Sequence, residues 1–133
     1  MFQKAVNLSV CVISLLLGCV IYAFLGDGTY IANKINEVVS IEVVPISAGM
    51  NIVRNYLADY LWGLALSCGL LVVFDEGKKN VIASISLAVG CGILWEILQN
   101  MEKVGGTGDI LDVIAYLFAG ATAILINLKE LKK

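Results

Sequence analysis

The feature that most constrains this chain is a set of four apolar runs, each about as long as a membrane is thick. They cover approximately residues 5–25, 56–74, 81–99 and 110–128. A helix that rises 1.5 Å per residue needs roughly 20 residues to cross a hydrocarbon core of about 30 Å. Lipid offers the backbone no hydrogen-bond partners, so isolated runs of this kind must be helical. The sequence therefore predicts an all-α integral membrane bundle of four transmembrane helices, forming a single domain over 1–133.

The composition agrees with an apolar solvent. Hydrophobic residues make up 59% of the chain and charged residues only 15%, with a mean hydropathy of +0.90, whereas a soluble domain has about 25% charged residues. The net charge of -2 argues against a nucleic-acid partner. The chain has no histidine, which rules out catalysis by histidine and zinc sites with histidine ligands.

The connection between the first two runs is the only long one, and it covers residues 26–55. Its middle, Ile41–Ile46, is apolar but contains the sole proline, Pro45. We interpret it as an interfacial or re-entrant segment on the outer leaflet, with a plain surface loop as the alternative. The first run is interpreted as an uncleaved helix, because it is longer than the apolar core of a signal peptide.

The distribution of basic residues predicts the orientation of the bundle. With four spans, both termini and the turn before residue 81 share one side. That side carries Lys4, Lys78, Lys79, Lys129, Lys132 and Lys133, and the other side carries Lys34, Arg54 and Lys103. Because basic residues concentrate on the cytoplasmic side, we expect a multi-pass membrane protein with both termini in the cytoplasm.

Acidic residues lie at corresponding ends of three of the predicted helices. Asp59 is near the start of the second run, Glu96 near the end of the third, and Asp109 and Asp112 at the start of the fourth. An ionisable side chain near the centre of a helix in the membrane costs at least about 2.5 to 3.5 kcal/mol, so its presence indicates a site. In the predicted orientation these carboxyl groups share one depth, just below the outer surface.

Helical spacing connects further polar residues to these acids. Glu96 with Gln99, and Asp112 with Tyr116, lie three or four residues apart and share a face. Arg54, the only arginine, precedes Asp59 and is the expected counter-ion, and its planar fork also suits a phosphate. The candidate ligand-binding residues are Arg54, Asn55, Asp59, Glu96, Gln99, Thr107, Asp109, Asp112 and Tyr116.

The polar turn before the fourth run has two interpretations. Gly105, Gly106, Thr107 and Gly108 precede Asp109 at the start of a helix, where free amides and the helix dipole attract anions. Alternatively, Thr107 or Asp109 simply caps the helix.

Small residues recur at helical spacing and indicate close helix packing. Ala115, Ala119 and Ala123 form one stripe, and Ser14 with Gly18 forms part of another. Such faces pack within one chain or between the chains of an oligomer.

The stretch from residue 95 to 120 resembles the VanZ-like membrane protein family. The resemblance rests on Trp95–Gln99, on the turn with Thr107 and Gly108, on Asp109–Tyr116 and on Gly120. Tyr116 stands where that family usually has asparagine. The resemblance implies a bacterial cell-envelope protein linked to antibiotic resistance, specifically to teicoplanin and related lipoglycopeptides.

Three functions follow as hypotheses. The leading one is a protein that binds or remodels an envelope lipid or lipid-linked glycan at the outer membrane face, where Arg54 and the turn amides would meet a phosphate. The second is a membrane enzyme that uses Asp59, Glu96 and Asp112 with a divalent cation such as Mg²⁺ to act on a polyprenyl phosphate. The third is a small transporter or channel subunit, since acids in membrane helices often mark ion paths.

Overall fold

The computed structural model describes residues 2–25, 34, 37–38, 49, 53–74, 77–101 and 108–132, and all regular structure in these residues is helical. The elements are α1 (Phe2–Leu25), the π-helical turn η1 (Val53–Leu57), α4 (Ala58–Val73), α5 (Lys78–Asn100), α6 (Ile110–Ile126) and α7 (Leu128–Leu131). The predicted all-α class is therefore confirmed for the described part of the chain.

The helices have the length and the apolar character that a membrane requires. Three segments are long and apolar enough to cross one, namely Phe2–Ile21, Arg54–Val73 and Lys78–Asn100. The fourth helix, α6, is apolar but has 17 residues, which gives a length of about 25 Å. The chain thus has three to four apolar helices that can span a membrane, which is the architecture of a membrane protein.

The helix bounds differ from the predicted runs at their ends. The predicted run 81–99 extends to Lys78–Asn100, because polar residues at both ends continue the helix beyond the apolar stretch. The run 110–128 ends at Ile126, where Asn127 leaves the helical conformation before the short α7. The interpretation of Pro45 and its neighbours as an interfacial segment lies outside the described residues.

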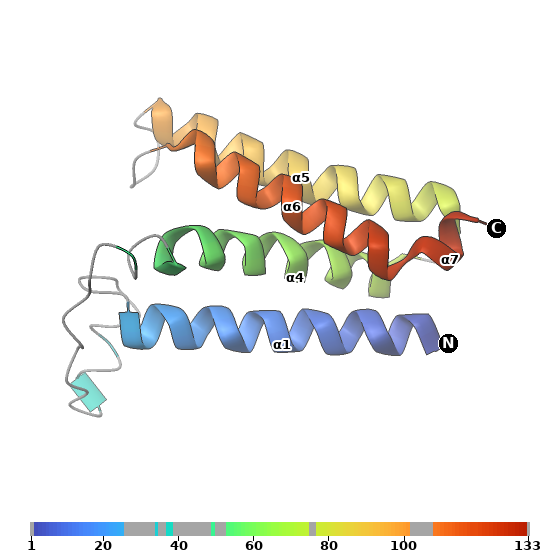
Figure 1. Ribbon diagram of the computed structural model, residues 1–133, viewed down its shortest axis with the longest axis horizontal. Coiled ribbons are helices and arrows are strands. Elements are labelled where there is room, and N and C mark those ends of the chain that lie inside the picture. The colour runs from blue at the N-terminus through green and yellow to red at the C-terminus, as the bar shows by residue number, and fades with distance from the viewer. Residues whose placement is uncertain are drawn as a thin grey trace.

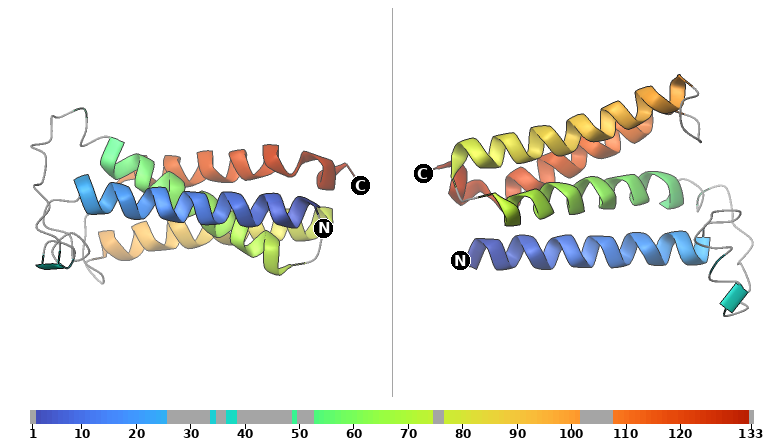
Figure 2. Two further views of the ribbon diagram at one scale, coloured as in Figure 1. Left: turned by 90° about the horizontal axis from the view of Figure 1, so that it is seen from below. Right: turned by 180° about the vertical axis from the view of Figure 1, so that it is seen from behind.

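The helix α4 lies at the centre of the bundle. It packs against α1 on one side and against α5 and α6 on the other, as Figure 1 and Figure 2 show. Its buried residues include small ones such as Gly63 and Ala65, which allow close helix approach. The predicted stripe on α6 is buried in the same core, since Ala119 and Ala123 are fully shielded from solvent. This stripe therefore packs against other helices of the same chain.

Both ends of the chain lie at one end of the bundle. In Figure 1, α1 begins, α5 begins and α7 ends on the same side. Three amide side chains connect α1 to the end of α6 there. Asn7 and Asn127 exchange two hydrogen bonds of 2.9 and 3.1 Å, and Gln3 Nε2 donates to Asn127 Oδ1 at 3.0 Å. The four acidic residues selected from the sequence, Asp59, Glu96, Asp109 and Asp112, lie at the opposite end.

Candidate functional site

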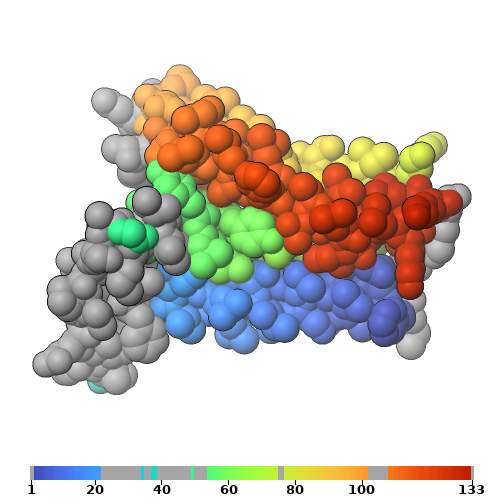
Figure 3. Space-filling model, in the orientation of Figure 1, coloured from blue at the N-terminus to red at the C-terminus, as the bar shows by residue number. Residues whose placement is uncertain are grey.

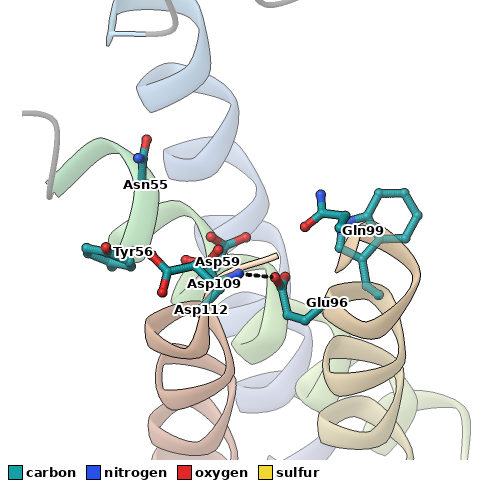
Figure 4. Close-up of a pocket in the computed structure, with 8 residues that line it drawn as sticks. Asn55, Tyr56, Asp59, Glu96, Gln99, Asp109 and Asp112 are labelled. Atoms are coloured by element: carbon teal, nitrogen blue, oxygen red, sulfur yellow. Dashed lines mark hydrogen bonds between the residues drawn. The ribbon is translucent and has the colours of Figure 1, made fainter. Parts of the chain in front are cut away.

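A polar pocket of about 240 Å³ lies at the end of the bundle away from the termini. Its walls come from η1 and the start of α4, from the end of α5 and from the start of α6, as Figure 4 shows. The lining residues are Asn55, Tyr56, Asp59, Trp95, Glu96, Gln99, Asp109 and Asp112. Three segments that are distant in sequence thus meet around one pocket.

Asp109 connects these three segments. Its Oδ1 accepts a hydrogen bond from the backbone N–H of Leu111 at 3.0 Å, so it is the N-cap of α6. Its Oδ2 accepts from the Tyr56 hydroxyl at 3.0 Å, and its own N–H donates to Glu96 Oε2 at 3.1 Å. The capping interpretation of Asp109 is confirmed, and the same residue fixes the pocket wall.

The approach of the chain to α5 at this point depends on Gly108. A Cβ added there would collide with the Asn100 side chain and would lie 2.6 Å from the carbonyl oxygen of Glu96. Only glycine fits so close to the last turn of α5. The backbone N–H of Asp109 can therefore reach the Glu96 carboxylate.

Tyr116 lies behind the pocket wall and contacts one of its carboxyl groups. Its hydroxyl donates a hydrogen bond to Asp59 Oδ1 at 3.1 Å. Its ring is packed between two helices, with Gly63 of α4 and Gly92 of α5 on either side, and a Cβ at either glycine would come within 3.0 Å of the ring. Tyr116 itself is buried and does not line the pocket. It holds the Asp59 carboxylate in place.

Four carboxyl groups share this small volume. Glu96 is only 4% exposed. Asp112 Oδ1 is buried and meets no hydrogen-bond donor in the described part of the chain. The carboxyl groups of Asp59, Asp109 and Asp112 line the same pocket as that of Glu96. Because like charges repel strongly at short range, a proton or a cation in the pocket stabilises the arrangement.

The pocket contains most of the residues that the sequence analysis selected. Asn55, Asp59, Glu96, Gln99, Asp109 and Asp112 line it. Arg54 does not line it, and its Nε donates to Asn55 Oδ1 at 3.0 Å. Thr107 lies outside the described residues.

Two lining residues were not among the predicted ligand-binding residues. Tyr56 lies three residues before Asp59, so helical spacing was the signal that indicated a shared face. The same spacing connects Glu96 with Gln99, which was among the predicted ligand-binding residues. Trp95 adjoins Glu96 and lies 47% exposed at the pocket rim.

The lining favours positively charged ligands. As far as the structure describes the chain, the lining has four acids, two amides, one tyrosine and one tryptophan, and no lysine or arginine. No group of three or more acidic or cysteine side chains in the described residues is arranged to hold a metal ion. The acceptors instead surround a space large enough for a small organic cation.

No family model matches the chain, and no curated protein or solved structure matches it either. The resemblance to the VanZ-like family stays a prediction.

Proposed function

We propose that this protein is a membrane binding protein whose acidic pocket receives the cationic head group of an envelope lipid or lipid-linked glycan. One observation carries the proposal. Four carboxyl groups, those of Asp59, Glu96, Asp109 and Asp112, line one pocket with no basic residue in its described lining. A protonated amine has three N–H donors and no acceptor, so a pocket rich in acceptors complements it.

The pocket is better suited to a cationic ligand than to the phosphate expected from the sequence. The backbone N–H of Asp109, at the start of α6, already donates to the Glu96 carboxylate. Arg54, the expected partner of a phosphate, is not in the lining. An anion would therefore meet four carboxyl groups, and repulsion would oppose its binding.

The position of the pocket supports a membrane-embedded ligand. The lining residues belong to the ends of helices that can span a membrane, so the pocket opens near the level of the lipid head groups. The VanZ-like resemblance suggests an envelope ligand connected to glycopeptide resistance, and this connection is part of the proposal.

The experiment measures binding of ethylammonium to the purified full chain in phosphatidylcholine nanodiscs. Trp95 fluorescence reports binding because this ring lines the pocket, and Trp62→Phe removes the other tryptophan. We expect Glu96→Gln to weaken binding about tenfold, the effect of losing one charged hydrogen-bond partner. The glutamine can still accept from the N–H of Asp109, so the fold should be retained.

The matched control is Glu130→Gln. Glu130 is equally buried, at 5% exposure, but belongs to α7 at the opposite end of the bundle. This variant should bind ethylammonium as the parent chain does. Equal binding by the Glu96→Gln protein and the parent chain would refute the proposed function.

A further inference from the structure

A second, apolar cavity lies directly beside the acidic pocket. It is a groove of about 780 Å³ whose lining, among the residues that the structure describes, comes from η1, α4 and α6. Figure 3 shows a face of the molecule on which α4 is visible between α6 and α1. Its lining includes Tyr56, Tyr60, Leu111, Ile114, Phe118 and Thr122.

One side chain separates the groove from the acidic pocket. Tyr56 lines both cavities, and its hydroxyl donates to Asp109 Oδ2 at 3.0 Å. Along α6 the two cavities also share a boundary, because Leu111 lines the groove and the next residue, Asp112, lines the pocket. In Figure 4, Tyr56 lies on the side of the aspartates that is away from Glu96 and Gln99. The groove therefore continues the pocket towards the apolar surface.

The length of the groove matches one leaflet of a bilayer. It runs along α6 from Leu111 to Thr122, a rise of about 16 Å. This is half of a hydrocarbon core of about 30 Å. At its inner limit, the Tyr60 hydroxyl donates to Thr122 Oγ1 at 3.0 Å and connects α4 to α6. A chain from a single leaflet fits this groove, whereas a spanning helix of another protein would extend beyond it.

We infer that the groove holds the apolar chain of a single-leaflet amphiphile whose ammonium head group occupies the acidic pocket. The inference rests on the proposed function and names the class of ligand. Charge complementarity selects the head group, because the polar end of the groove opens at carboxylates and, among the described lining residues, none is basic. The apolar lining of the groove selects the chain. Tyr56, which contacts both cavities, lies where the head group and the chain join.

The test separates the chain from the head group. Dodecylammonium carries both parts, ethylammonium only the head group, and dodecanol has the chain without the charge. Binding of each probe to the full chain in phosphatidylcholine nanodiscs is measured by isothermal titration calorimetry, with titration into empty nanodiscs subtracted. We expect dodecylammonium to bind about tenfold more tightly than either other probe.

Leu111→Trp fills the groove, and Leu125→Trp is its matched control. Leu111 is 45% exposed and lines the groove, while Leu125 is 65% exposed on the same helix and lines neither cavity. We expect Leu111→Trp to lower the affinity for dodecylammonium about tenfold and to leave that for ethylammonium within about twofold. Leu125→Trp should change neither affinity.

The outcomes distinguish the two proposals. If both tryptophan variants bind dodecylammonium equally while ethylammonium binding still depends on Glu96, the groove inference is refuted and the proposed function stands. If ethylammonium does not bind at all, the proposed function fails and the inference fails with it. Dodecanol binding as tightly as dodecylammonium would show that charge is not recognised, and would also refute the inference.

Discussion

The aromatic ring of Tyr116 lies directly against Gly92, and a Cβ at position 92 would come within 2.5 Å of Tyr116 Cγ. This contact sets the distance between α5 and α6 next to the pocket. It also fixes the ring whose hydroxyl reaches Asp59. Gly90, two residues earlier on α5, has no atom within 4 Å of the corresponding Cβ position. The two glycines therefore have different structural roles.

Gly92→Ala should destabilise the protein, because the added methyl group overlaps a buried ring that packs against both neighbouring helices. We expect a loss of about 1 to 3 kcal/mol. Gly90→Ala is the control, and it should be neutral or stabilising by about 0.5 to 1 kcal/mol, because alanine favours a helix over glycine. Thermal unfolding in detergent, followed by circular dichroism, measures both. An equal effect of the two substitutions would contradict the packing described for Tyr116.

The two hydrogen bonds between the side-chain amides of Asn7 and Asn127 should contribute to stability as a coupled pair. Both side chains are at least 98% buried, since Asn7 is 2% and Asn127 is 1% exposed. Asn127→Ala leaves the Asn7 amide without its partner in an apolar interior, which costs about 1 to 3 kcal/mol. Asn7→Ala should have a similar effect, and the double variant should lose less than the sum. Additive losses in thermal unfolding would show that the two side chains do not depend on each other.

Asparagine should replace Asp109 as the N-cap of α6 but not as the acceptor of the Tyr56 hydrogen bond. In Asp109→Asn the amide oxygen can still accept from the N–H of Leu111, whereas the amide nitrogen cannot accept from the Tyr56 hydroxyl. Asp109→Ala loses both interactions, and loss of the cap alone costs about 1 kcal/mol. We expect the order of stability to be aspartate, asparagine, alanine in chemical denaturation. If the asparagine variant were as unstable as the alanine variant, the cap would not contribute.

The sequence predicts the helices well because the length of an apolar run can be counted over consecutive residues. That length is then compared with the roughly 20 residues that a helix needs to cross a membrane. The sequence also predicts that Asp59, Glu96 and Asp112 share a depth, since each lies at the corresponding end of its run. The hydrogen bonds between Asn7 and Asn127, which lies just beyond the end of α6, could not be predicted, because the two residues are 120 positions apart in the sequence. No local pattern contains that information.

The role of Tyr116 could not be predicted for a similar reason. Its spacing from Asp112 indicates a shared helix face. However, its hydroxyl bonds Asp59 on α4, and its ring is held by glycines of two other helices. A glycine in a helix shows neither whether a residue packs closely against it, as the difference between Gly90 and Gly92 illustrates, nor which residue does so. The partner is defined only by the way the helices pack.

The orientation of the bundle in the membrane stays a prediction, and it can be tested by labelling single cysteines. The starting protein has Cys11, Cys19, Cys68 and Cys91 replaced by serine or alanine. Gly106→Cys and Lys132→Cys then introduce one thiol each, near opposite ends of the predicted bundle. Because basic residues concentrate at the end with the termini, we expect an impermeant maleimide added to intact cells to label position 106 and not position 132. Position 132 should react only after the membrane is opened. Labelling of position 106 solely from the cytoplasmic side would reverse the orientation and place the acidic pocket at the inner surface.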